Sequence, residues 1–137
     1  MLMALPSFGQ LFAKLPTAIA SEVFESLVTS PTVQIERIIS WGHTSPATGW
    51  YDQAWQEWVM VLQGEAVVEW VEAEAQIGDA GDTAIAVQSQ RLQPGDYLLL
   101  PAHCRHRVAW TTPEQPTIWL AVHFGDRLPP SDPGAII

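Results

Sequence analysis

The chain has 137 residues, of which 47% are hydrophobic and only 15% are charged. This length suits one domain with a single core, and the composition excludes a disordered chain. Fifteen acidic and six basic side chains give a net charge of −9, which disfavours nucleic acid and anionic membrane surfaces as partners. The single cysteine, Cys104, cannot form an intramolecular disulfide, and no signal segment or long apolar run is apparent. We therefore expect a cytoplasmic protein with no membrane or nucleic-acid partner.

The first 32 residues are predicted to form a helical appendage. Apolar residues follow helical spacing in 7–15 and again in 17–29, and Pro16 separates the two segments. We expect two short helices here, which cover the rest of the domain or a partner subunit.

From residue 33 to residue 127 the pattern changes to short strands. Alternation begins in 33–41, and 57–63 is apolar on both faces, as in a strand inside a two-layer sandwich. Clusters of Gly, Pro and Asp separate the further apolar runs. This pattern predicts an all-β domain of the antiparallel jelly-roll type. Residues 128–137, with three prolines, are expected to form a surface strap or a mobile tail.

Two histidines follow a predicted strand in the segment 93–110. Gly95 precedes this strand and Pro101 ends it, while His103 and His106 lie just beyond the turn. The two imidazoles therefore arrive where two strands meet.

A second segment, 50–64, supplies carboxylates. Glu57 stands seven residues before the strand-ending Gly64, and Asp52 stands five residues before Glu57. Together the two segments look like the two halves of one site.

These segments resemble the two motifs of the cupin superfamily, which run G-x5-H-x-H-x3,4-E-x6-G and G-x5-P-x-G-x2-H-x3-N. The second motif matches at Gly95, Pro101 and His106. His103 stands in place of the second glycine of that motif, and Trp110 stands in place of the asparagine.

The first motif matches in its later part, at Glu57 and Gly64. Trp50 and Asp52 stand where the family has its two histidines. The resemblance spans about 42–110, and it implies a cupin jelly-roll barrel, also called a double-stranded β-helix, here with short N-terminal helices in front of it.

The resemblance also implies a divalent metal ion inside the barrel. Sets of imidazole and carboxylate ligands leave coordination positions open for a substrate or dioxygen, and they suit iron, manganese, nickel or zinc. At the matching positions Asp52, Glu57 and His106 form the expected set, and His103 is expected to face the same cavity. Because Asp52 supplies oxygen instead of nitrogen, the preference shifts toward harder ions such as manganese.

Other residues are candidates for the pocket around the metal. His43 and His123 could each replace the missing ligand, and Trp50 and Tyr51 are expected to form an aromatic wall beside a small organic ligand. The alternative for His43 is a solvated loop residue, and the alternative for His123 is a sheet residue with ordinary hydrogen bonds.

Two functions follow from this interpretation. The first is a small cupin that binds a divalent metal and a small organic molecule, with oxygenase or isomerase chemistry. The second is a non-enzymatic cupin that binds or senses a small molecule and has a degenerate metal site. For both we expect a homodimer, because the edge strands of an open sandwich invite pairing and the apolar N-terminal helices need a surface to cover.

Overall fold

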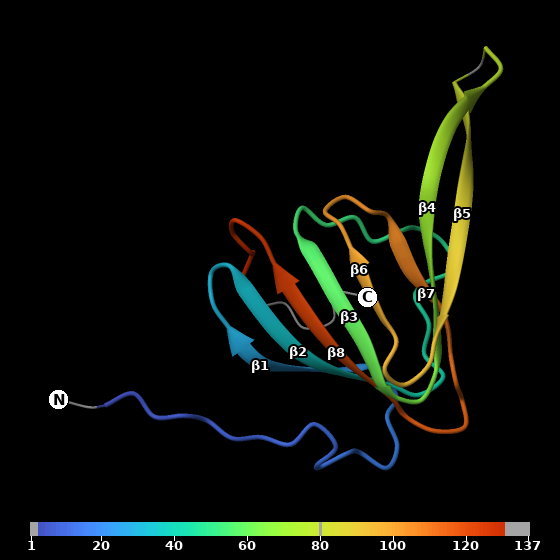
Figure 1. Cartoon of the computed structure of the whole chain (residues 1–137). Coiled ribbons are helices and arrows are strands. Elements are labelled where there is room, and N and C mark those ends of the chain that lie inside the picture. The colour runs from blue at the N-terminus through green and yellow to red at the C-terminus, as the bar shows by residue number, and fades with distance from the viewer. Residues whose placement is uncertain (1–2, 80, 131–137) are drawn as a thin grey trace.

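The structure, a computed structural model, describes residues 3–79 and 81–130. Eight strands form two antiparallel sheets within these ranges (Figure 1). The strands are β1 (Val23–Thr29), β2 (Val33–Ser40), β3 (Gln56–Gln63), β4 (Ala66–Ile77), β5 (Asp82–Leu92), β6 (Tyr97–Leu100), β7 (His106–Thr111) and β8 (Thr117–Phe124).

The five-stranded sheet has the order β1-β2-β8-β3-β6, and the three-stranded sheet has the order β5-β4-β7. The predicted all-β class is therefore confirmed. In the described residues no ladder between these strands joins the two sheets, so the expected barrel is open. The part of the predicted tail beyond residue 130 lies outside the described residues.

The prediction of two N-terminal helices is wrong. Residues 3–22 contain only turns, bends and irregular backbone, and the next seven residues form β1. Val23 pairs with Ile39 across an antiparallel ladder, which satisfies the backbone groups that a helix would have satisfied internally. Pro16 lacks an N–H and disfavours helix for the residue before it, so the apolar spacing is not enough to form helices. No helix long and apolar enough to span a membrane occurs in the described part of the chain.

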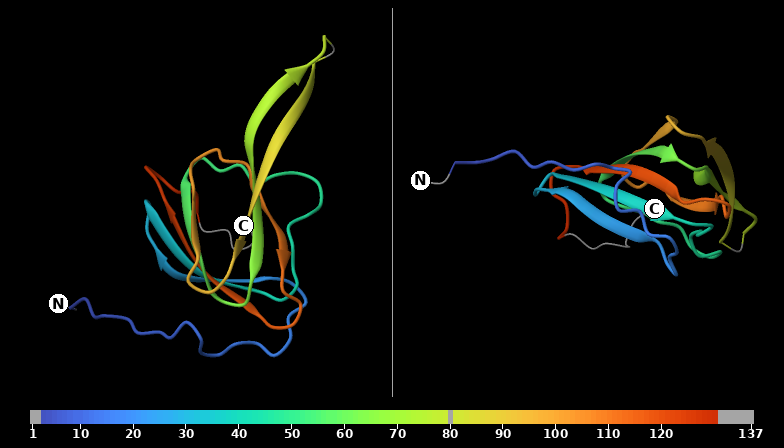
Figure 2. Two further views of the ribbon diagram at one scale, coloured as in Figure 1. Left: turned by 45° about the vertical axis from the view of Figure 1, so that its right-hand side comes forward. Right: turned by 90° about the horizontal axis from the view of Figure 1, so that it is seen from below.

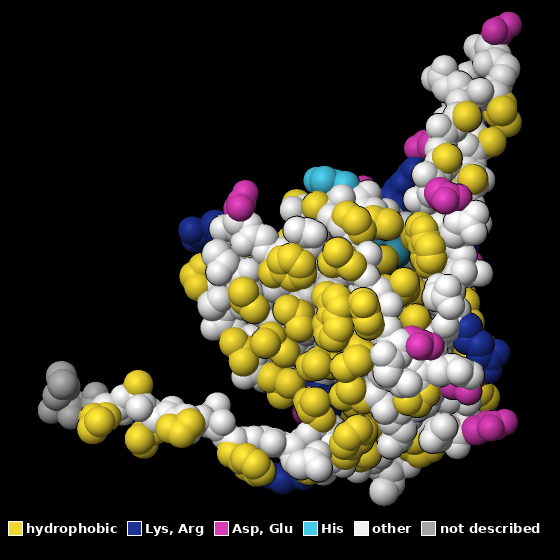
Figure 3. All heavy atoms as spheres, viewed as in Figure 1, with side chains coloured by type: hydrophobic (Ala, Val, Ile, Leu, Met, Phe, Trp, Pro, Cys, Tyr) yellow, Lys and Arg dark blue, Asp and Glu magenta, His cyan; other side chains and the backbone are white. Residues whose placement is uncertain are grey.

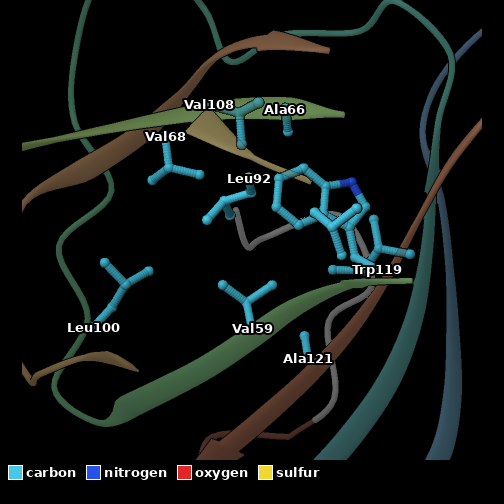
Figure 4. Packing of buried hydrophobic residues seen from close by; sticks show 10 residues of the cluster. Val59, Ala66, Val68, Leu92, Leu100, Val108, Trp119 and Ala121 are labelled. Carbon is cyan, nitrogen blue, oxygen red and sulfur yellow. The ribbon is translucent and has the colours of Figure 1, made fainter. Parts of the chain in front are cut away.

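The hydrophobic core lies between the two sheets. In Figure 4, Val59 and Ala121 of the five-stranded sheet face Val68 and Val108 of the three-stranded sheet. Side chains alternate along a strand, so Glu57, two residues before Val59, points toward the same interior. The hydrophobic core consists of Ile38, Val59, Val61, Ala66, Val68, Leu92, Leu100, Val108, Trp119 and Ala121.

Strands β4 and β5 continue past the sheets as a two-stranded ribbon (Figures 1 and 2). The pairing of β4 with β7 ends at Trp70, opposite His106, and from there the ribbon pairs only with itself among the described strands. An ion pair of 2.7 Å between Arg105 and Glu74 ties the base of the ribbon to the turn after β6. The base of the ribbon therefore adjoins the end of the domain where β7 begins.

Gly64 is expected to be indispensable for the turn between β3 and β4. It has a φ of 82°, and a Cβ added there would lie 2.7 Å from the Cα of Thr117. Gly64→Ala should lower the free energy of unfolding by about 3 kcal/mol, from left-handed strain and overpacking together. Gly95→Ala is the matched control, because Gly95 has a φ of 94° but, among the described residues beyond its chain neighbours, no heavy atom lies within 4 Å of the added Cβ. It should lose only about 1–2 kcal/mol, and equal losses in urea unfolding would contradict the steric argument.

Candidate functional site

Backbone hydrogen bonds join the two segments that carry the sequence motifs. The N–H of Tyr51 donates to the carbonyl of His106 at 2.9 Å, and the N–H of His106 donates back to the carbonyl of Tyr51 at 3.1 Å. The N–H of His103 donates to the carbonyl of Gln53 at 2.6 Å. The segments therefore lie side by side at the end of the domain where β3 and β7 begin.

Four ionisable side chains from four different strands are buried together at this end. Glu36 comes from β2, Glu57 from β3, His106 from β7 and His123 from β8, and each is at most 1% exposed. Glu57 lies directly opposite His123 across the β3–β8 ladder. Cross-strand neighbours have side chains on the same face, so these two point into the interior together. We call these four residues the buried cluster of the site.

His106 is oriented by a backbone carbonyl. Its Nδ1 lies 2.9 Å from the carbonyl oxygen of Cys104, which can only accept, so Nδ1 carries a hydrogen. Its Nε2 faces Glu57, at 3.5 Å from Oε1, and Gln53 donates an amide N–H to the same oxygen at 3.1 Å. Burial alone lowers the pKa of His106, but the contact with Glu57 and the carbonyl of Cys104 outweigh burial and raise this pKa above its ordinary value.

His123 is held in the other tautomer. The indole N–H of Trp55 donates to its Nδ1 at 3.0 Å. An indole nitrogen can only donate, so Nδ1 must present a lone pair, and the hydrogen of the neutral ring is on Nε2. That Nε2 lies 3.7 Å from Glu36 Oε2 and 3.8 Å from Glu57 Oε2. The Nε2–H group therefore faces two carboxylates and is beyond hydrogen-bonding distance of both.

Five buried polar atoms at this site have no hydrogen-bond partner among the residues that the structure describes. Leaving such an atom without a partner costs about 1–3 kcal/mol, and buried polar atoms in native proteins are nearly always paired. Because all five belong to residues of one site, they suit a polar group that is not part of the chain. The atoms are Glu36 Oε2, Gln53 Oε1, Glu57 Oε2, His106 Nε2 and His123 Nε2.

Three of the side chains with unpaired atoms fit a metal ion, and His123 does not. Among the described residues, no three His, Cys, Asp or Glu side chains form a ready-made metal site. Even so, the imidazole Nε2 of His106 and the carboxylate of Glu57 are 3.5 Å apart, less than twice a metal–ligand bond of about 2.0–2.2 Å, so both can contact one ion. The amide Oε1 of Gln53 is a third buried donor without a partner. His123 does not fit, because its Nε2 carries the hydrogen.

Asp52 and His103 pair with each other outside the buried cluster. Asp52 Oδ1 lies 2.8 Å from His103 Nδ1, and the two side chains are 48% and 70% exposed. His103 has a φ of 62°, in the left-handed region that favours glycine, which is the residue of the family motif at this position. The structure thus brings together Glu57 and His106 of the four predicted ligands, and a metal role for Asp52 and His103 stays a prediction.

The other predicted pocket residues lie around the cluster or away from it. The ring of Tyr51 is 6.0 Å from the ring of His106, whereas the ring of Trp50 stacks under the guanidinium of Arg107 at 4.0 Å. Trp50 and Tyr51 line a cavity of 150 Å³. The backbone carbonyl of His43 accepts a hydrogen bond from Thr111 at the end of β7, so His43 lies at the opposite end of that strand from the cluster.

Sequence reasoning did not identify Glu36 and Gln53, and it did not predict the hydrogen bond from Trp55 to His123. Gln53 and Trp55 lie within the first motif segment, at positions that the motif leaves unspecified. Glu36 stands two residues before Ile38 in β2, so the two side chains lie on the same face of the strand. This spacing was the only sign in the sequence that Glu36 points into the interior. Its closeness to His123 depends on the β2–β8 pairing, which a single sequence does not reveal.

Comparison with known proteins identifies related folds. The family model described as Cupin domain matches residues 42–123. The crystal structure of a proposed mannose-6-phosphate isomerase from Ralstonia eutropha JMP134 is 46% identical, has a TM-score of 0.72 and covers 87% of this chain and 98% of that chain. A cupin superfamily protein from Desulfitobacterium hafniense DCB-2 is 22% identical, with a TM-score of 0.60 and coverage of 92% and 99%. Hydroxypropylphosphonic acid epoxidase from S. wedmorenis is 19% identical, with a TM-score of 0.55 and coverage of 77% and 52%. The last two show similarity of fold alone, and no curated protein matches the sequence.

The raised pKa of His106 predicts how stability depends on pH in metal-free protein. The contribution of protonated His106 is fully present below its unfolded pKa of about 6.5 and is lost as the pH rises through the higher folded pKa. The stability difference between wild type and His106→Gln should therefore shrink as the pH is raised from about 6 to about 9. Urea unfolding with a chelator present measures it. A difference that grows with pH would contradict the raised pKa.

The tautomer of His123 is predicted to depend on Trp55. Nitrogen-15 NMR of the wild type should show His123 protonated at Nε2 and unprotonated at Nδ1. Trp55→Phe keeps an aromatic ring and removes the N–H donor, so Nδ1 should become protonated in a measurable fraction of molecules. Trp58→Phe is the control, because Trp58 lies on the other face of β3 and should leave the tautomer unchanged. An unchanged tautomer in Trp55→Phe would show that the indole does not set it.

Proposed function

Because this chain belongs to the cupin family, we propose that it binds a divalent metal ion and a small organic molecule at the buried cluster and moves a proton on that molecule, as an isomerase does. The family match and the 46% identical structure establish the jelly-roll cupin fold. The observation that carries the proposal is the set of five buried polar atoms without partners, all in one site.

In this proposal the metal is held by His106 and Glu57, with the amide oxygen of Gln53 as a third donor. The carbonyl of Cys104 fixes the tautomer of His106 so that Nε2 can present a lone pair, which is the usual role of an outer hydrogen bond at a metal site. Manganese, iron, nickel and zinc all accept such donors, and two oxygen donors favour a harder ion such as manganese. A bound ion would act as a Lewis acid toward an oxygen of the ligand.

Glu36 and His123 form the other side of the site. The Nε2–H of His123 can donate to an oxygen of the ligand, and Glu36 Oε2 at 3.7 Å can accept a proton or a hydroxyl hydrogen. A proton shift between neighbouring carbon atoms needs one group that removes the proton and a site that stabilises the charge left on oxygen. Glu36 supplies the first, and the His123 N–H contributes to the second. We therefore favour an isomerase-type reaction over an oxygenase.

The ligand is proposed to be a small molecule with an uncharged, oxygen-rich end. Two carboxylates in the cluster repel an anion, whereas hydroxyl and carbonyl groups match the donors and acceptors present. A groove of 730 Å³ is lined by Trp55, Arg127, Leu128 and their neighbours. The groove adjoins the site because Trp55 also donates a hydrogen bond to His123. A sugar phosphate, the substrate class named for the Ralstonia protein, would have to turn its phosphate away from the cluster and toward Arg127.

A non-enzymatic binding module is the second candidate function. It is favoured by the position of Asp52 and His103, which pair at the surface and leave only two of the four predicted ligands in the cluster. In that case the cluster would bind the ligand through hydrogen bonds alone.

Metal binding is expected to depend on Glu57 and His106 and not on His103. After reconstitution with manganese, elemental analysis should find metal in the wild type and in His103→Gly, and strongly reduced metal in Glu57→Gln and His106→Gln. The two cluster variants remove a charge or a ring nitrogen with little change of volume, so circular dichroism should show the fold retained. His103→Gly is the matched control, because glycine suits its positive φ.

Three outcomes of this experiment separate the alternatives. No metal in the wild type would eliminate the metal site and favour the binding module. Equal metal in all four proteins would place the ion elsewhere. Loss of metal in His103→Gly would bring the Asp52–His103 pair into the site.

Conversion of mannose or mannose 6-phosphate to the ketose, followed by NMR, then tests catalysis. Glu36→Gln should abolish any conversion while retaining the metal.

A further inference from the structure

The groove of 730 Å³ beside the buried cluster is bounded by three separate segments. They are the turn between β1 and β2, the two residues that precede β3, and residues 127–130 after β8. Small-molecule sites have volumes of about 300–1,000 Å³, so this volume is in their range. Prolines, Trp55 and Leu128 make most of the lining apolar, and Arg127 is the only charged side chain among the described residues that line it. We call it the side groove.

The walls of the side groove are fixed to each other. The N–H of Leu128 donates to the carbonyl of Pro31 at 2.7 Å, and the N–H of Gly125 donates to the carbonyl of Thr32 at 3.1 Å. A Cβ added at Gly125 would lie 3.2 Å from the Cβ of Trp55, so the segment after β8 packs closely against the residues before β3. The side groove is therefore preformed, which lowers the entropic cost of binding a ligand.

Arg127 is exposed and has no carboxylate partner among the described residues. The other four arginines each form an ion pair with a glutamate, and the pairs are Arg37–Glu25, Arg91–Glu65, Arg105–Glu74 and Arg107–Glu69. Basic side chains are sparse on the face drawn in Figure 3, and the chain has 15 acidic side chains against six basic ones. In such a chain an arginine without a partner presents a guanidinium that matches an external carboxylate through two parallel hydrogen bonds.

Trp55 connects the side groove to the buried cluster. Part of its side chain lines the groove, and its indole N–H donates to Nδ1 of His123 at 3.0 Å. The two rings meet edge to face, with 6.3 Å between their centroids and an angle of 73° between their planes. A molecule that packs on Trp55 therefore lies one side chain away from His123. It changes the surroundings of the hydrogen bond that fixes the tautomer of His123.

We propose that the side groove binds a small organic carboxylate, with its carboxylate on Arg127 and its apolar body on Trp55 and Leu128. The apolar lining matches the body, and the unpaired guanidinium matches the charge. A singly charged group suits the groove better than a phosphate, because one guanidinium neutralises one charge and the net charge of −9 repels any charge that remains. This site is separate from the buried cluster and needs no metal there, so it goes beyond the proposed function.

The probe for this site is phenylpropionate, titrated into the full-length protein with a chelator present. NMR should show saturable binding that moves the indole N–H resonance of Trp55. The neutral amide of the probe and the variant Arg127→Gln should each weaken binding about 10-fold, because each removes one charge from the ion pair. Arg91→Gln is the matched control and should leave the dissociation constant unchanged. It removes the same charge at the other end of β3, where Arg91 pairs with Glu65.

The nitrogen-15 signal of His123 Nδ1 gives a second readout. It should shift as the side groove fills, because the probe alters the hydrogen bond that Trp55 donates. Lack of saturable binding to the wild type, or equal binding to Arg127→Gln, would overturn the proposal. A shift of His123 without a shift of Trp55 would place the probe in the buried cluster instead.

Residues 131–137, which lie outside the described residues, are the other candidate occupant of the side groove. The full-length double variant Ile136→Ser, Ile137→Ser should bind phenylpropionate as the wild type does. If this variant binds the probe and the wild type does not, residues 131–137 fill the groove and the proposal fails. The chelator keeps all of these outcomes independent of metal binding at the buried cluster, and circular dichroism checks the fold of each variant.

Discussion

The alternation of side chains along β3 is the constraint on which the rest of the structure depends. Its inward residues, Glu57, Val59 and Val61, supply one carboxylate of the buried cluster and two members of the core. Its outward residues, Trp58 and Met60, lie half-buried on the opposite face of the five-stranded sheet. A shift of the register by one residue would exchange the two faces, placing Glu57 in solvent and Trp58 in the core. Site, core and outer surface are thus fixed by the same pairing with β8 and β6.

The two buried histidines differ because their outer hydrogen bonds differ. A carbonyl holds His106 with its hydrogen on Nδ1, and an indole N–H holds His123 with its hydrogen on Nε2. Two similar rings on neighbouring sides of Glu57 therefore have opposite capacities, one as a lone-pair donor and the other as a hydrogen-bond donor. The buried cluster therefore presents one imidazole lone pair and one imidazole N–H to the same interior.

The sequence contained enough information for most strands and for two residues of the buried cluster. Period-two patterning and turn residues predict most strands, and the motif spacing identified Glu57 and His106, which the structure places 3.5 Å apart. The N-terminal helices failed because apolar spacing alone does not show whether a segment can pair with a neighbouring strand. Glu36 and the role of Trp55 were missed because both depend on contacts with His123, 87 and 68 positions away. Such contacts require knowledge of the strand register.

The long ribbon formed by β4 and β5 has a consequence for how this chain can vary. Beyond Trp70 the ribbon makes no ladder with other described strands, and its side chains in 72–79 and 81–91 are exposed on either side of the tip. Residues can therefore be added or removed there in cross-strand pairs without changing any register inside the domain. The ribbon tip is the natural position for an inserted epitope, a fluorescent label or a length difference between relatives, all outside the buried cluster.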